Sequence, residues 1–543
     1  MTDGTRGGGT VRIRNATRAL WGRLRWFLAD RFAIDTRSLA LFRIALGLLV
    51  VADLIARSRN FSFYYTDDGV VTQALAEQGT ADNAVSVSYL TSEPELIAAL
   101  FVLQGLIALA MVVGYRTRLA TVLSFLFVIS LDHHNPYVLS YADTLFRLLF
   151  LWAIFLPLGD RWSVDALQAA EMGLERAGPR PVVASAATAL AMGQMVFMYF
   201  LNGIHKSTSA TWREGDAAPL VFGIDEMTFL LGDFMRNVPT LISAGGLLWF
   251  YLLLASLLLV LLRGRPRYLL VGLFAGGHAS FAVTVRIGAF AYVALAGLTL
   301  FLQPAFWRDA GRVVRAAGLG PERVSRTMED RVGRPLARVL PSFRLLPGRL
   351  VRIKRATYTV AVGLVVVALA LVVAAFLLNF GTVIDGTYDQ HALNAEVESH
   401  PAGAHVYEVA DALNVRQPEW SVFAPHPRTT DRYYVFGART ADGDEVDVYN
   451  DREFTWDRPG AQLQRQHGTY RQRFFMNSVR RTSAGGDLAE RYGDQLCRSY
   501  AEDHGTELTH ISMFEVTETI TFETIDDPDA RESDRNHFYR HRC

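Results

Sequence analysis

The chain has 543 residues, half of them hydrophobic, and its formal net charge is zero. The balanced charge implies no acidic or basic partner for the chain as a whole, and the apolar residues gather in long runs. A CxxC metal motif, a P-loop and an HExxH helix are absent from the sequence. This pattern favours a polytopic membrane protein.

The first 37 residues are polar and basic, with eight arginines and no separate apolar core followed by a small-residue cleavage site. A cleavable signal peptide is therefore not predicted. Residues 16–32 favour an amphipathic basic helix that lies on the membrane surface.

Nine apolar stretches follow, each a candidate membrane-crossing helix. A span needs about 20 apolar residues, and fewer suffice where neighbouring helices shield its ends. We therefore predict an all-α membrane bundle of about nine transmembrane helices, at residues 38–56, 94–114, 117–131, 144–158, 182–203, 241–262, 268–283, 287–303 and 357–379.

The distribution of basic residues gives this bundle an orientation. If the N-terminus is cytoplasmic, the inside segments carry 29 Lys and Arg residues and the outside loops carry 6. Cytoplasmic loops collect positive charge, so this asymmetry predicts a multi-pass cell-membrane protein with a cytoplasmic N-terminus. An odd number of spans then places residues 380–543 outside the cytoplasm.

Residues 308–356 form a basic cytoplasmic linker before the last predicted span, 357–379. Residues 304–356 hold 13 Lys and Arg residues against four Asp and Glu residues. A nucleic-acid-binding arm would have this charge, but attraction to anionic lipid better explains a segment bracketed by membrane helices. We predict no nucleic-acid partner.

The chain changes character after residue 380. Alternating stretches at 433–437, 445–449 and 512–522 are typical of strands, and Ala441-Asp-Gly-Asp between the first two indicates a hairpin turn. We predict an extracytoplasmic α+β domain over residues 380–543. It contains the only two cysteines, Cys497 and Cys543, which would form a disulfide within one chain or between two chains in an oxidising compartment.

One stretch places ionisable residues at the end of an apolar helix. Lys206 follows His205 just after the span predicted at 182–203. Such a lysine can simply be an anchor whose stem lies in lipid. Desolvation, however, favours the neutral amine, which would act as a base on a phenol or hydroquinone delivered by the bilayer.

Other polar residues fall at the same predicted outer depth. They include the loop 132–143 with its two histidines and two aspartates, His278 within the span 268–283, and Arg286 after it. Ionisable groups brought to one membrane depth by separate segments favour an outward-facing cavity in the bundle.

Two simpler alternatives remain open for these residues. Asp143 and Arg147 have the i,i+4 spacing of a helical ion pair. His133, His134 and His278 are possible metal ligands, but no spacing defines a site, and we predict none.

The segment Tyr199-Phe-x-x-Gly203-x-x-Lys206, followed by Trp212 and Gly215, resembles the catalytic-lysine segment of vitamin K-dependent gamma-carboxylases and their prokaryotic relatives, the horizontally transferred transmembrane (HTTM) domain proteins. Leu39-Ala-Leu-Phe-Arg-Ile-Ala-Leu-Gly and Arg161-Trp-Ser-Val-Asp165 resemble further segments of the family, and Trp420-Ser-Val-Phe-Ala-Pro resembles a segment of many prokaryotic members. The resemblance covers residues 35–307 well and assigns 38–307 to an HTTM domain.

The resemblance also implies roles for individual residues. In the carboxylases, the lysine that matches Lys206 deprotonates reduced vitamin K, and the residues that match His134 and His278 assist the base and the addition of CO2. By the same resemblance these three residues are expected to be catalytic. We expect His205, Trp212 and Arg286 to bind substrate.

These expectations combine into a quinol-linked, carboxylase-like enzyme that acts on an extracytoplasmic peptide. A reduced, vitamin K-like quinone is the expected cofactor, and membrane lipid and quinone are the expected partners. The alternative is a non-catalytic membrane module that binds a secreted peptide or helps it mature. A transporter is less favoured, because the sequence shows no internal repeat and no paired broken helices.

Overall fold

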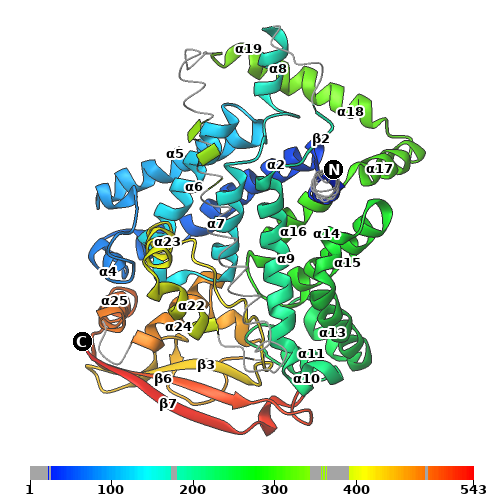
Figure 1. Cartoon of the computed structure of the whole chain (residues 1–543). Coiled ribbons are helices and arrows are strands. Elements are labelled where there is room, and N and C mark those ends of the chain that lie inside the picture. The colour runs from blue at the N-terminus through cyan, green and yellow to red at the C-terminus, as the bar shows by residue number, and fades with distance from the viewer. Residues whose placement is uncertain are drawn as a thin grey trace, which may run out of the picture.

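The computed structural model describes residues 22–23, 26–172, 180–342, 356–357, 359–360, 363, 390–460, 462–482 and 487–543. Helices build most of the molecule, and a five-stranded sheet forms one end of it (Figure 1). Most of the last predicted span, 357–379, lies outside the described residues, as do residues 16–21 and 24–25 of the amphipathic helix predicted at 16–32; residues 26–31 of that segment are helical.

Helices occupy the other eight predicted spans. They are α2 (Thr36–Ser58), α5 (Pro94–Val113), α6 (Thr117–His134), α7 (Tyr141–Ala153), α9 (Ala186–Ser207), α13 (Pro239–Leu254), α15 (Gly264–Thr284) and α16 (Phe290–Leu298). Among the described residues, α2, α5, α9 and the run Pro239–Leu261 are long and apolar enough to cross a membrane, and a bent pair of helices raises this number to five. The chain is thus a mostly helical protein with four or five candidate spans, and the count of nine is not confirmed.

Four of the eight helices, α6, α7, α15 and α16, are not candidate spans by themselves, and length and composition explain this for α7 and α6. The 13 residues of α7 extend about 20 Å at 1.5 Å per residue, less than the roughly 30 Å of a bilayer core. Helix α6 has 18 residues, but it includes Arg118 and ends in Asp132-His133-His134. These polar residues lower the mean hydropathy of the helix.

The bent pair joins α16, through the single turn Thr299–Phe301, to α17 (Pro304–Ala316) at an angle of 104°. Three exposed arginines lie on α17, so we describe it as a surface helix rather than as part of a span. It continues into α18 (Pro321–Met328) and α19 (Arg334–Val339). These helices lie at the end of the molecule opposite the sheet (Figure 1).

The C-terminal domain begins with α22 (Gln390–Ser399) and α23 (Pro401–Ala412), and its antiparallel sheet has the order β5-β4-β3-β6-β7. The strands are β3 (Thr430–Thr440), β4 (Glu445–Asp447), β5 (Arg452–Glu453), β6 (Leu508–Thr519) and β7 (Ser533–Arg542). The hairpin between β3 and β4 is confirmed, with Arg439 opposite Glu445. Helices α24 (Tyr470–Thr482) and α25 (Asp487–His504) precede β6, and a disulfide joins Cys497 on α25 to Cys543 after β7.

The C-terminal domain packs directly on the helical part. The ring of Phe475 on α24 lies 5.4 Å from that of Tyr64 and 5.6 Å from that of Phe63, both on α3 (Phe61–Tyr65). Tyr492 on α25 joins the same aromatic cluster, 6.1 Å from Phe63. Because these rings are buried together, the sheet domain has a defined position over the helix ends.

Candidate functional site

Lys206 lies in the last turn of α9, and local sequence defines the helix that carries it. Ser185 caps the start of α9, and its side chain accepts a hydrogen bond from the backbone N–H of Thr188. After a largely apolar run, Asn202, His205 and Lys206 share one face of the helix, because they are three and four residues apart. The helix therefore delivers three polar side chains to one place.

The amine of Lys206 is buried beneath a segment of the C-terminal domain. The residue is 2% exposed. Its Nζ donates hydrogen bonds to the carbonyl oxygens of Val422 (2.6 Å) and Phe423 (3.0 Å), and it lies 3.8 Å from the centroid of the Trp212 ring. Carbonyl acceptors and an aromatic face both suit an ammonium group.

Trp212 on α10 (Ala210–Glu214) shares a partner with the lysine. Its Nε1 donates to the same carbonyl oxygen of Phe423, at 2.9 Å, while its ring covers Nζ. Gly215 ends α10 at φ 94°, a backbone conformation that favours glycine and turns the chain away after the tryptophan. The structure thus brings two of the predicted site residues, Lys206 and Trp212, into direct contact.

The rest of the α9 face binds the same segment. Nε2 of His205 lies 3.0 Å from the carbonyl oxygen of Glu419. Asn202 donates from Nδ2 to the carbonyl oxygens of Trp420 (2.6 Å) and Val422 (3.1 Å). Asn202 was not among the predicted site residues, and its position one helical turn before Lys206 is the signal that could have identified it.

His278 lies in an aromatic cluster beside α9. Its Nε2 is 2.8 Å from the hydroxyl of Tyr199, and the side chain is fully buried next to the rings of Trp249 and Phe281. The second ring nitrogen, Nδ1, has no hydrogen-bond partner among the residues that the structure describes. Tyr199 is two helical turns before Lys206, so His278 is linked to the lysine's helix but is not hydrogen-bonded to the amine.

His134 lies at the end of α6, in a different environment. Its Nε2 is 3.2 Å from the carbonyl oxygen of Tyr65, and the two rings stack at 5.7 Å. Its neighbour His133 contacts the carbonyl oxygen of Val85 through Nδ1, at 3.0 Å. No hydrogen bond joins His134 to Lys206 in the described part of the chain, where no group of three or more His, Cys, Asp and Glu residues is placed to hold a metal ion.

The aspartates of the loop 132–143 belong to a buried ionic network. Asp132 pairs with both Arg57 and Arg147, and Asp143 pairs with Arg57 (3.4 Å) and Arg471 (2.9 Å). The described residues therefore do not show the simple i,i+4 ion pair between Asp143 and Arg147: Arg57 of α2 and Arg471 of α24 pair with Asp143, and Asp132 of α6 pairs with Arg147. Arg471 also binds Asp53 of α2 and so ties the C-terminal domain to the first helix.

Arg286 is likewise engaged with the C-terminal domain. Its Nη1 donates to the carbonyl oxygens of Gln464 and His467, the latter at 3.2 Å. Its backbone N–H donates to the carbonyl oxygen of Met227, at 2.7 Å. Arg286 therefore joins the loop 462–467 through its guanidinium and Met227 through its backbone N–H, and within the described residues no hydrogen bond connects it with Lys206.

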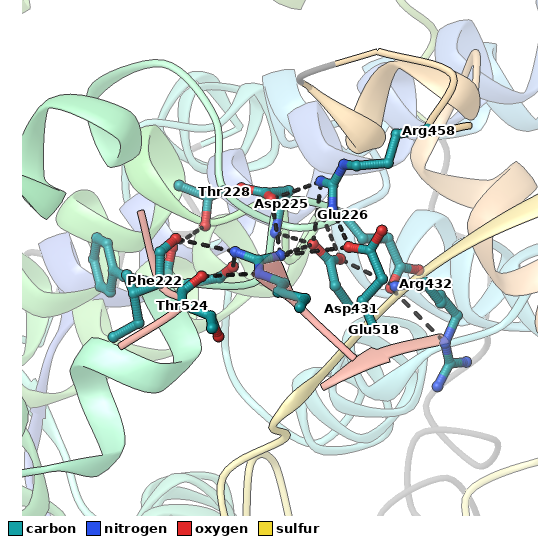
Figure 2. Close-up of polar contacts among 12 residues, drawn as sticks. Phe222, Asp225, Glu226, Thr228, Asp431, Arg432, Arg458, Glu518 and Thr524 are labelled. Carbon is teal, nitrogen blue, oxygen red and sulfur yellow. Dashed lines mark hydrogen bonds and ion pairs between the residues drawn. The ribbon is translucent and has the colours of Figure 1, made fainter. Parts of the chain in front are cut away.

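A second buried ionic cluster lies where the loop 222–228 meets the sheet (Figure 2). The carboxylate of Asp431 accepts hydrogen bonds from the backbone N–H groups of Asp225 (2.8 Å) and Glu226 (3.0 Å). Arg531 donates from Nη1 to both Asp225 and Asp431, at 3.0 and 3.1 Å, and Arg458 pairs with Asp225 at 2.7 Å. These contacts anchor β3 a few residues after the segment that covers Lys206.

The choice of lysine at position 206 is itself informative. The chain contains 52 arginines and only two lysines, Lys206 and Lys354. Arginine supplies the cation in all the buried ionic contacts described above, yet a lysine stands at the buried end of α9. Arginine stays charged at any usable pH, whereas lysine can lose its proton, so the exception favours a role that needs an amine.

Comparison with known proteins identifies a family. The model of the HTTM domain matches residues 32–307, which include α2 to α16 and the whole Lys206–Trp212 stretch. Comparisons with curated proteins and with solved structures gave no match. Since the matched region covers just over half of the chain, this protein belongs to the HTTM domain family.

Proposed function

We propose that this membrane protein is a quinol-linked, carboxylase-like enzyme in which Lys206 is the base. The observation that carries the proposal is the burial of this lysine at the end of an apolar helix, in a chain that otherwise uses arginine. A membrane-embedded ionisable residue is costly to keep and marks functional sites. Membership of a family associated with gamma-carboxylases supports the choice of reaction.

The site gives partial support for a reduced quinone. Trp212 offers an aromatic surface next to the amine, and Phe423 packs against the apolar cluster that contains Trp212, which suits a quinone ring. Two carbonyl groups, however, occupy hydrogen-bonding positions of Nζ, so a quinol hydroxyl would reach Lys206 only after the segment around Phe423 has moved. In this proposal His134 and His278 assist from a distance, and an extracytoplasmic peptide is the substrate.

The proposal includes the topology predicted from charge: nine spans, a cytoplasmic N-terminus and an extracytoplasmic C-terminal domain. The excess of basic residues in the inside segments supports this orientation. The position of arginine-rich α17, α18 and α19 at the end opposite the sheet also agrees with it (Figure 1).

A specific observation favours the alternative of a non-catalytic membrane module. Lys206, His205 and Asn202 all bind carbonyl groups of the segment 419–423, so they can serve simply to hold the C-terminal domain on α9. In that case the lysine would be a structural link, and the module would bind a secreted peptide without turnover.

The test uses purified full-length protein in lipid nanodiscs with a reduced naphthoquinone. We expect protein-dependent oxygen uptake, and incorporation of labelled CO2 when a glutamate-containing peptide is supplied. A matched sample of denatured protein measures the uncatalysed oxidation of the quinol. Oxygen uptake equal to that of the denatured sample, together with no CO2 incorporation, would reject the enzyme and leave the peptide-binding module.

A further inference from the structure

Residues 421–426 form a short cover over Lys206 between two buried anchor points. On one side, Trp420 is fully buried. On the other, the fully buried Asp431 accepts hydrogen bonds from the backbone N–H groups of Asp225 and Glu226. Residues 421–426 themselves are half-buried or exposed. The segment is thus anchored at both ends, and its middle is only partly buried.

The cover binds Lys206 through main-chain carbonyl groups. The carbonyl oxygens of Val422 and Phe423 accept from Nζ, and that of Phe423 also accepts from Nε1 of Trp212. Phe423 has φ 52°, a left-handed conformation that is unfavourable for a residue other than glycine. Strain of this kind persists only where surrounding contacts compensate for it, and it is typical of functional segments.

Side-chain contacts along the cover add to the bonds from Lys206 and Trp212, and one joins the hydroxyl groups of Tyr141 and Ser421 at 3.3 Å. Nδ2 of Asn202 donates to the carbonyl oxygen of Val422 at 3.1 Å, and the side chains of Ser209 and His426 approach to 3.3 Å. The ring of Phe423 packs beside Trp212 and Leu220. Loss of these contacts would free the middle of the segment while Trp420 stays in the core.

We infer that residues 421–426 are a movable cover and that Lys206 meets molecules from the aqueous phase only when this cover withdraws. An ammonium has three donors and no acceptor, so a protonated Lys206 offers no lone pair to a substrate, and at 2% exposure the residue is closed to molecules in water. The closed arrangement is therefore a resting state. The role of the cover rests on the proposed function, because a lysine that acts as a base must meet its substrate.

The small number of lysines makes the cover directly testable. Full-length protein in nanodiscs is treated with a water-soluble, membrane-impermeant amine-reactive ester, and mass spectrometry follows modification of Lys206. Labelling of Lys206 in denatured protein, followed in the same way, gives the reaction rate of the exposed amine. We compare the parent with Phe423→Ala, which removes the ring that packs the cover down, and with Phe522→Ala, a control at a 53% exposed position of the same domain.

We expect Lys206 in the parent to react at least about tenfold more slowly than in denatured protein, a ratio that corresponds to about 1.4 kcal/mol in favour of the closed state. Phe423→Ala should raise the rate several-fold, and Phe522→Ala should leave it unchanged. Equal rates in native and denatured parent would overturn the inference. So would an unchanged rate in Phe423→Ala, or labelling of Lys206 only by a lipid-soluble reagent.

Labelling needs no turnover, so the inference and the proposed function can fail separately. If Lys206→Arg keeps its catalytic activity while the parent shows protected, Phe423-dependent labelling, the base assignment is wrong and the cover stands. If activity depends on Lys206 but its labelling is unprotected, the base assignment stands and the cover is wrong.

Discussion

Glu518→Gln tests the buried ionic cluster that anchors the C-terminal domain. Glu518 on β6 lies within 4 Å of both Arg458 and Arg531, and its side chain is 5% exposed. Burial raises the pKa of its carboxyl group from the ordinary 4.5 to about 7. Attraction to the two arginines opposes this rise, and repulsion from Asp431 and Asp225 adds to it.

The raised pKa determines the sign of the pH dependence. A carboxyl group that binds its proton more tightly in the folded state stabilises the fold most below pH 4.5, and this contribution is lost as the pH rises through 7. The difference between the two pKa values corresponds to about 3 kcal/mol. Burial and repulsion from Asp225 raise the pKa of Asp431 to about 6 and so act in the same direction. Arginines lower the pKa of Glu226 from the ordinary 4.5 to about 2 against the effect of burial. Its contribution to stability is therefore fully present and constant across this window, and is lost only as the pH falls from 4.5 towards 2.

The assay is thermal unfolding of the purified parent and of Glu518→Gln at several values between pH 5 and pH 8. The variant does not titrate at this position, so the melting temperature of the parent should fall relative to that of Glu518→Gln as the pH rises. Exposed Glu502, changed to Gln, controls for the loss of one carboxyl group. A difference between parent and Glu518→Gln that is flat over this range, or that grows in favour of the parent towards pH 8, would refute the reasoning.

Three further predictions concern the buried network, the topology and the cysteines. Asp132→Ala should destabilise the fold by about 3–5 kcal/mol, because it leaves Arg57 and Arg147 buried without their shared partner, and chemical unfolding against the exposed control Asp503→Ala would show it. An unchanged midpoint would show that the network is not needed for stability. Reporter fusions after Arg355 and after Phe380 should report opposite sides of the membrane, and the same side for both would exclude the proposed topology. Protein from its native membrane should show no free thiol, because Cys497 and Cys543 have Cα atoms 5.7 Å apart and form a disulfide in the structure; two free thiols per chain would contradict this pairing.

Local pattern predicted the elements that carry the site. The apolar run at 182–203 became α9, with Lys206 at its end, and the alternating stretches after residue 430 became strands of one sheet. These elements follow from the periodicity of neighbouring residues, which a sequence displays directly. The resemblance of the Tyr199–Gly215 stretch to an HTTM segment likewise identified the family, because it too is local.

The partners of these residues could not be predicted, because they come from distant parts of the chain. The carbonyl groups that bind Lys206 lie 216 and 217 residues away, and main-chain acceptors leave no trace in side-chain pattern. The polar loop 132–143 was interpreted as lining a cavity. Its aspartates are instead neutralised by Arg57, which is 75 residues from Asp132, and by Arg471, which is 328 residues from Asp143. Local spacing suggested a pair between Asp143 and Arg147 because sequence shows only near neighbours.

Turnover of Lys206→Arg is the most direct test of Lys206 as a base. Arginine keeps the cation that binds the carbonyl groups of Val422 and Phe423, so folding and insertion should survive, but it cannot give up its proton at usable pH. Lys354→Arg is the matched control, since Lys354 is the other lysine of the chain. We predict that quinol-dependent turnover, at matched expression, falls by about 10²–10⁴ in Lys206→Arg and stays at the parental level in Lys354→Arg. Parental turnover in Lys206→Arg would contradict the base and leave Lys206 as a structural link between α9 and the C-terminal domain.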